Sequence, residues 1–239
     1  LKTIFNEISL ACKEKNFTYE RKGKYDLINL LPIPLVVNPA QIKYLHKACL
    51  LIKDAMSKLI DLYIAYPEIR DILPLTEEEN IWINETWTER HKKTRGIWSR
   101  LDFHFDIYNP KWKDTITFFE DNSVAVGGNH YAPTAEDLIV KLVLPQIKKV
   151  NKHILLEKNE DIRNLLLYEI LHQAKTLGRK RLNIAFAEDK TLTSGITEFP
   201  SLVEFYNKEF GKKIEMLKIY LIDPRELYLK NDEIYYKNH

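Results

Sequence analysis

Three side chains in residues 99–128 are of the types that bind a hard divalent cation. Asp102 lies in the segment "RLDFHFD", and Glu120 and Asn122 lie in "TITFFEDNS". Each supplies an oxygen atom, and Mg²⁺ prefers oxygen ligands in octahedral geometry, completed by water and phosphate oxygens. Arg100 stands two residues before Asp102. The stretch therefore has the residue types of a metal-and-phosphate site.

The same residues also fit the polar face of an ordinary β-hairpin. Residues 97–108 alternate apolar and polar side chains, and the turn region "NPKWKD" separates them from a second strand, "TITFFEDNS". Arg-x-Asp and Glu-x-Asn each skip one residue, which puts both members of a pair on one face. Half-exposed hairpins with solvated polar residues are common. The spacing permits a site without establishing one.

Helices are predicted on both sides of this hairpin. The Asn38-Pro39 pair supplies a cap and a first-turn proline for a long helix with an apolar stripe, which Pro67 ends. After the hairpin, a helix over residues 134–150 is predicted to have Thr134 as its cap and a kink or break at Pro145. Shorter helices are predicted over residues 2–16 and 77–85.

The last third of the chain has the element order of a βαβ unit. A helix over residues 159–177 ends at Gly178, and then come the strand "RLNIAFAE", a helix over residues 201–210 and the strand "IEMLKIYLID". This order predicts a small parallel sheet. The polar connection "DKTLTSGITEFP" follows the carboxyl end of the first strand, which is where parallel sheets commonly bind ligands.

Composition argues against some classes of partner. The 239 residues include 36 Lys+Arg and 34 Asp+Glu, a formal net charge of +2, so there is no reason to expect a nucleic acid partner. The two cysteines, Cys12 and Cys49, form no metal-binding motif, which fits a reduced, cytoplasmic compartment. Cys49 falls on a helical apolar stripe and is expected to be buried. No apolar run is long enough to span a bilayer.

The hairpin motif resembles that of the circularly permuted ATP-grasp ligases, the group that includes glutathionylspermidine synthase. Those sequences read Arg-x-Asp, then a strand, then Glu-x-Asn-x-Asp-x-Pro-Gly-Gly; here the segments are "RLDFHFD" and "TITFFEDNSVAVGG". The segments "YDLINLLPIPLVVNPAQIKYLHKA" and "LIDPRELYLKNDEIYYKN" are similar in order to that family. The resemblance implies an α/β (mixed α+β) fold: an ATP-grasp part with a hairpin and long helices over residues 1–150, then a small Rossmann-like preATP-grasp unit over residues 151–239.

The resemblance also implies roles for individual residues. Asp102, Glu120 and Asn122 would hold Mg²⁺ on the phosphates of ATP. Arg100 would be catalytic, because a guanidinium stabilises charge on the γ-phosphate and on an acyl phosphate. The residues implied to contact the substrate are Ser123, Gly127, Gly128 and His130.

Two positions depart from the family pattern. Val124 and Val126 stand where the family has an acid and a proline, which puts substrate selection by this loop in doubt. His104 and His130 each have two interpretations. His104 is either a solvated side chain or a hydrogen-bond partner of Asp102. His130 is either a structural residue or a substrate contact.

The implied activity is that of an ATP-dependent carboxylate–amine ligase acting on a small carboxylate and an amine or peptide-like substrate. In the permuted order, the lid that supplies lysines to ATP follows the Rossmann-like segment. We therefore expect this chain to be the amino-terminal part of a longer enzyme, inactive by itself. The alternative, from a different class, is a non-catalytic ATP-grasp-like binding or scaffold module.

Overall fold

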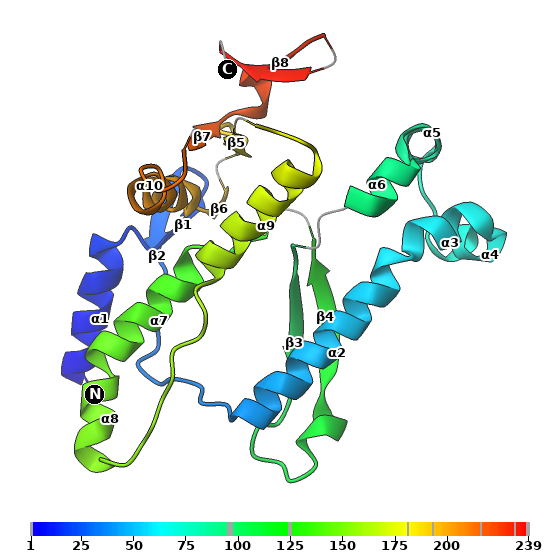
Figure 1. The fold of residues 1–239 in the computed structure, drawn as a ribbon. Coiled ribbons are helices and arrows are strands. Elements are labelled where there is room, and N and C mark those ends of the chain that lie inside the picture. The colour runs from blue at the N-terminus through cyan, green and yellow to red at the C-terminus, as the bar shows by residue number, and fades with distance from the viewer. Residues whose placement is uncertain are drawn as a thin grey trace. The chain divides into compact units, whose positions relative to one another are not determined.

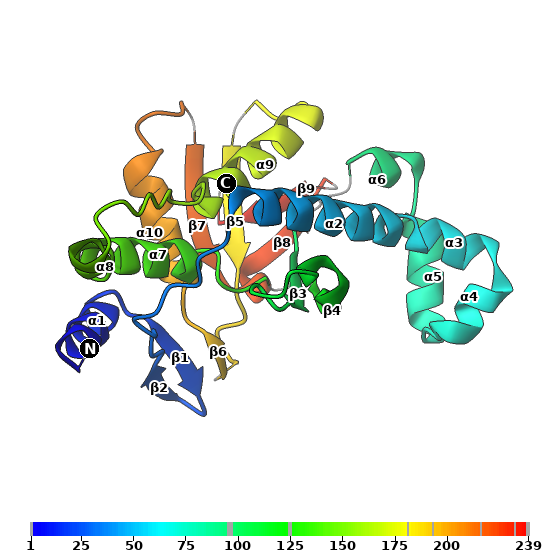
Figure 2. The same ribbon diagram turned by 90° about the horizontal axis from the view of Figure 1, so that it is seen from below.

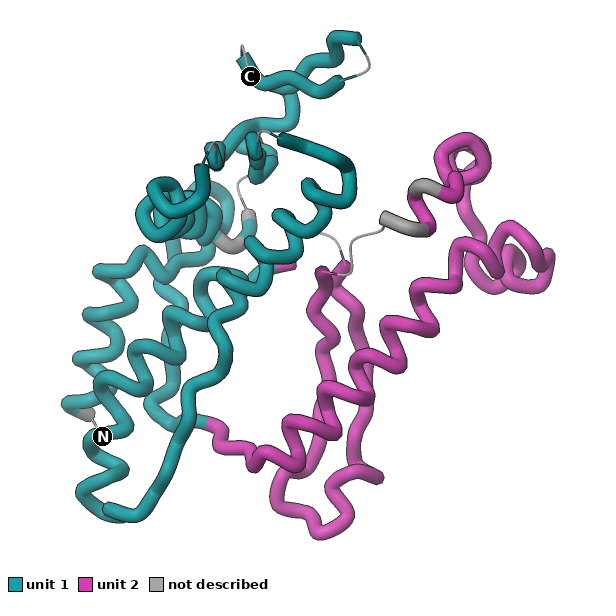
Figure 3. Tube along the Cα trace, in the orientation of Figure 1, with its two compact units in different colours: residues 1–34, 127–239 teal, residues 35–126 magenta. Residues whose placement is uncertain are grey.

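Helices and small β-sheets, one of them a parallel pair, make this a mixed α/β protein (Figure 1). The computed structural model describes residues 2–94, 98–123, 126–180, 182–192, 194–215, 217–231 and 233–237. Contacts divide the chain into two units (Figure 3). Unit 1 comprises Leu1–Pro34 and Gly127–His239, and unit 2 comprises Leu35–Val126. These bounds differ from those of the predicted domains 1–150 and 151–239, which stay a prediction.

Unit 2 begins with the predicted long helix. The Asn38 side chain accepts a hydrogen bond from the Gln41 backbone N–H at 2.9 Å, and the Gln41 side chain accepts one from Asn38 at 3.0 Å, which completes a capping box. The helix is shorter than predicted, because a turn at Lys58 interrupts it before Pro67. The elements of unit 2 are α2 (Pro39–Ser57), α3 (Leu59–Ala65), α4 (Pro67–Ile72), α5 (Glu77–Thr86), α6 (Glu89–Thr94), β3 (Arg100–His104), the 3-10 helix η1 (Trp112–Thr115) and β4 (Thr117–Asn122).

Strands β3 and β4 pair antiparallel, which confirms the predicted hairpin. The strands are shorter than the alternating segments; Ile97, at the start of the first, lies outside the described residues. The register shifts after Asp102, so that Phe103 pairs with Phe118 and Phe119 is the extra residue of a β-bulge. Helix α2 lies along the hairpin (Figures 1 and 2), where the Gln41 side chain donates to the Ile107 carbonyl at 3.1 Å.

Unit 1 contains the predicted βαβ unit. β5 and β7 pair in parallel, with α10 between them in sequence, and Figure 2 shows α10 running beside β7. Strand β6, which was not predicted, pairs with β1 in a three-stranded sheet. The elements of unit 1 are α1 (Lys2–Glu14), β1 (Thr18–Arg21), β2 (Lys24–Leu27), α7 (Tyr131–Leu142), α8 (Leu144–Val150), α9 (Ile162–Thr176), β5 (Leu182–Ala187), β6 (Ser194–Ile196), α10 (Phe199–Glu209), β7 (Leu217–Ile222), η2 (Pro224–Glu226), β8 (Leu227–Lys230) and β9 (Glu233–Tyr236).

The helix predicted over residues 134–150 agrees with the prediction at its break and differs from it at its start. It is split before Pro145, as predicted: α7 ends at Leu142, and α8 carries the proline in its first turn. The prediction that Thr134 caps it is wrong, because α7 begins at Tyr131 and the Thr134 hydroxyl donates back to the His130 carbonyl at 2.7 Å.

Helices α1 and α7 pack together over the core of unit 1. Its buried residues are Ile8, Cys12, Phe17, Tyr131, Leu138 and Val143. Cys49, expected to be buried, is only partly so. Within the described part of the chain, no helix has both the length and the apolar character needed to cross a membrane.

Candidate functional site

The four polar residues singled out in the hairpin share one face. Asp102 lies directly opposite Glu120, and Arg100 lies directly opposite Asn122. Residues opposed in an antiparallel pair project to the same side, with Cβ atoms about 4.5–5.5 Å apart. The register therefore brings these four side chains together, as the spacing predicts. We call this set, Arg100, Asp102, Glu120 and Asn122, the hairpin face.

Charge on the hairpin face is partly balanced. The Arg100 Nε donates to the Asp102 Oδ1 at 2.9 Å, and both side chains are partly exposed. Glu120 is exposed.

Among the described residues, no group of three or more His, Cys, Asp and Glu side chains is placed to hold a metal ion. Two carboxylates and an amide are instead the partial set that suits Mg²⁺ when a nucleotide supplies further oxygens.

Asn122 carries a buried polar atom without a partner. Its Nδ2 has no hydrogen-bond partner among the residues that the structure describes. A half-turn of the carboxamide would place its oxygen, instead of its nitrogen, at this buried position. Buried unpaired polar groups are unfavourable and uncommon in native proteins. The unpaired Nδ2 fits a hydrogen-bond acceptor on a bound ligand, whereas the oxygen, placed there by the half-turn, would suit a metal ion.

The opposite face of β4 holds an ion pair that the sequence interpretation missed. Asp121 lies between Glu120 and Asn122, so its side chain points away from the hairpin face. Lys53 of α2 donates to the Asp121 Oδ2 at 3.2 Å and to the Ser123 Oγ at 3.2 Å. The Lys53 and Asp121 side chains are only 18% and 10% exposed.

Hydrogen bonds around Asp121 stabilise its charged form. Burial favours a raised pKa for this carboxyl, but hydrogen bonds from Ser123 and Lys53 outweigh burial and hold the pKa below its usual range. The Ser123 hydroxyl donates to Asp121 at 2.5 Å, and its predicted contact with substrate stays a prediction. The sequence contains one signal for the Lys53–Asp121 ion pair. Lys53 is a charged residue four positions after Cys49, which lies on the apolar stripe of α2.

The remaining predicted substrate residues belong to a different part of the chain. Gly127, Gly128 and His130 lie in unit 1, whereas the hairpin face and Ser123 lie in unit 2. Val124, one of the departures from the family pattern, falls outside the described residues. A substrate-binding role for these three residues stays a prediction.

Backbone N–H groups at the start of α7 converge on one buried carboxylate. Gly128 and Asn129 donate to the Glu198 Oε1 at 2.6 and 3.1 Å. His130 and Tyr131 donate to its Oε2 at 2.8 and 2.9 Å. Glu198 is 1% exposed, and a negative charge is favourable at a helix N-terminus. Glu198 thus supplies the cap that was assigned to Thr134, and it satisfies the loop amides.

His130 is held neutral in the core of unit 1. Its residue exposure is 9%, and its Nδ1 has no partner among the described residues. Burial, and then the positive charge of Arg163, lower the pKa of His130 to about 4. These surroundings favour the structural interpretation of His130. His104, on the hairpin, is exposed, as expected for a solvated side chain.

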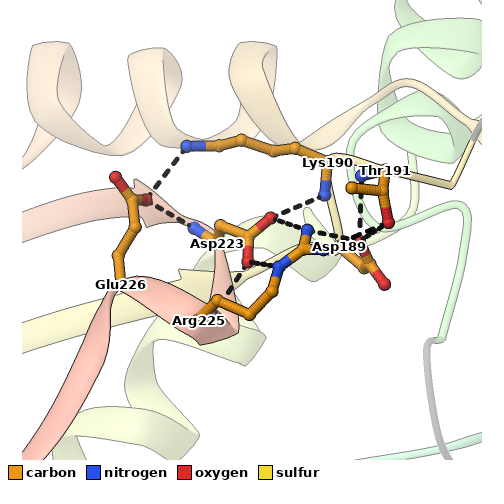
Figure 4. A network of polar contacts seen from close by, with 6 residues as sticks. All are labelled: Asp189, Lys190, Thr191, Asp223, Arg225 and Glu226. Atoms are coloured by element: carbon orange, nitrogen blue, oxygen red, sulfur yellow. Dashed lines mark hydrogen bonds and ion pairs between the residues drawn. The ribbon is translucent and has the colours of Figure 1, made fainter.

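A polar network joins the carboxyl ends of β5 and β7 (Figure 4). Arg225 donates to Asp223, and also to the Asp189 Oδ1 at 2.7 Å. Lys190 donates to the Glu226 Oε2 at 3.1 Å. Hydrogen bonds from Arg225 hold the pKa of Asp223 well below its usual range. These charged groups are hydrogen-bonded to one another. Their contacts connect the ends of β5 and β7 without a bound ligand between them.

The geometry of the hairpin face and the resemblance of its motif are the basis for assigning a function. The chain matches no protein-family model, no curated protein and no solved structure.

Proposed function

We propose that this chain is part of an ATP-dependent carboxylate–amine ligase of the circularly permuted ATP-grasp type. The observation that carries the proposal is the register that sets Asp102 opposite Glu120 and Arg100 opposite Asn122. The unpaired end of the Asn122 amide supports it.

Elements outside the hairpin also support the proposal. The long helix α2 follows the proline-broken segment and precedes the hairpin, in the order that the resemblance implies. The parallel pair β5–β7 and the short β8–β9 hairpin occur in the order of a preATP-grasp unit, and Asp223-Pro224 stands between β7 and β8.

The hairpin face would bind the phosphates of ATP. Asp102, Glu120 and Asn122 would hold Mg²⁺, which neutralises phosphate charge when bound. Arg100, oriented by its bond to Asp102, would place a fixed positive charge at the γ-phosphate. In the proposed reaction, a substrate carboxylate attacks the γ-phosphate and ADP leaves. The amine then attacks the acyl phosphate carbon, and phosphate leaves as the amide forms.

Changes in the hairpin face are expected to weaken metal–nucleotide binding while the fold persists. We expect Glu120→Gln and Asn122→Ala to lower the affinity for Mn²⁺, measured by electron paramagnetic resonance in the presence of ATP, by about tenfold or more. Glu120 is exposed and the Asn122 Nδ2 makes no hydrogen bond within the described chain. The free energy of unfolding should therefore change by about 0.5 kcal/mol or less.

Asp114→Asn is the matched control, because Asp114 is an exposed acid in the connection between β3 and β4. It should bind Mn²⁺ as the wild type does. The protein is used at the full length that its gene encodes, and ADP formation is followed against Mg²⁺ concentration in the same samples. Equal Mn²⁺ affinity in all variants would contradict the proposal. Binding without ADP formation would favour the non-catalytic binding module.

A further inference from the structure

We infer that Lys53 and Asp121 form a positioning pair that sets the metal-binding geometry of the hairpin face from behind. The inference rests on the proposed function, since it concerns the same face. Neither residue would touch metal or nucleotide. Both would act through Glu120 and Asn122, which flank Asp121 in β4.

Asp121 connects two segments of unit 2. It accepts hydrogen bonds from Lys53 on α2 and from Ser123 just after β4. One carboxylate therefore ties the end of β4 to helix α2.

The hairpin needs such an anchor because its own ladder is short. β3 and β4 form a two-stranded sheet, and two-stranded sheets are of marginal stability alone. The bulge at Phe119 immediately precedes Glu120, and bulges twist and bend the strand that carries them. A rotation of β4 at this point would move Glu120 and Asn122 together. The Lys53–Asp121 pair opposes that rotation at the residue between them.

Burial distinguishes this pair from an ordinary surface ion pair. The Lys53 and Asp121 side chains are 18% and 10% exposed, whereas those of Lys58 and Asp54, on the same helix and its cap, are 60% and 64% exposed. Exposed pairs contribute little to stability. Removing Lys53 would leave the largely buried Asp121 carboxylate without its cation. Strand β4 would then shift, or the carboxylate would turn towards solvent.

The test is Lys53→Met, which keeps the length of the side chain and removes its charge. We expect the affinity for Mn²⁺ in the presence of ATP to fall about tenfold, the effect typical of losing a group that orients metal ligands. Lys58→Met is the matched control and should bind as the wild type does. Lys53→Arg, which keeps the charge, should restore most of the affinity. All measurements are made where circular dichroism shows every variant folded.

A double variant, Lys53→Met with Asp121→Asn, covers the case in which the single variant does not fold, because it leaves no unpaired charge. It should also bind Mn²⁺ about tenfold more weakly. Wild-type affinity in a folded Lys53→Met or in the double variant would overturn the inference, even if thermal stability fell. If Glu120→Gln weakens binding and Lys53→Met does not, this inference fails alone. If the wild type binds no Mn²⁺ with ATP, both proposals fail.

Discussion

Replacement of Glu198 by alanine is expected to lower the free energy of unfolding by about 4 kcal/mol or more. The Glu198 carboxylate accepts the backbone N–H groups of Gly128, Asn129, His130 and Tyr131 while only 1% exposed. Each buried donor left without an acceptor costs about 1–3 kcal/mol. Four donors at the low end of that range give the expected loss. Urea unfolding followed by circular dichroism measures it.

Glu204→Ala is the matched control, because Glu204 lies exposed on α10, the helix that begins directly after Glu198. It should change stability by about 0.5 kcal/mol or less. All four tryptophans lie in unit 2, so tryptophan fluorescence shows whether unit 2 unfolds in the same step. A loss below about 1 kcal/mol for Glu198→Ala would mean that water replaces the carboxylate, which contradicts its role as the cap of α7.

Acid is expected to destabilise unit 1 through His130. Its pKa is about 4 in the folded protein against an ordinary value of 6.5, because burial and the charges of Arg163 and Lys15 outweigh the opposing charge of Asp161. The unfolded chain therefore binds a proton at higher pH than the folded protein. The contribution of His130 to stability is complete above pH 6.5 and is lost as the pH falls towards 4. It amounts to at most about 3 kcal/mol.

His130→Gln, which does not titrate, isolates this contribution from that of the carboxyl groups. The difference in unfolding free energy between the wild type and His130→Gln should shift in favour of the variant as the pH is lowered from 7 to 4. His153→Gln is the control, because His153 is exposed. A difference between wild type and His130→Gln that stays constant over this range would show that His130 protonates freely in the folded protein.

Short-range signals explain what could be predicted of the candidate site. Alternation placed the four residues on two strands, and skipping one residue put each pair on one face. The structure adds the register, which sets Asp102 opposite Glu120. The bulge at Phe119 could not be predicted, because it depends on how Phe103 and Phe118 pack across the strands. The metal-binding role itself stays a prediction.

The sequence by itself determined the elements whose hydrogen bonds and periodicity are local. The two residues of the Asn38–Gln41 capping box are three positions apart, so the box is visible without any tertiary contact. The break at Pro145 follows from a missing N–H group. The βαβ unit follows from strand and helix periods in succession.

Only the tertiary structure decided the features that join distant segments. Glu198 caps a helix that begins at Tyr131, 67 residues before it, and Lys53 holds Asp121 across 68 residues. The division into units also separates Ser123 from Gly127, four residues later. The physical reason is that a buried donor or charge requires a partner but does not specify where in the chain that partner lies. Folding selects that partner by bringing the segments together.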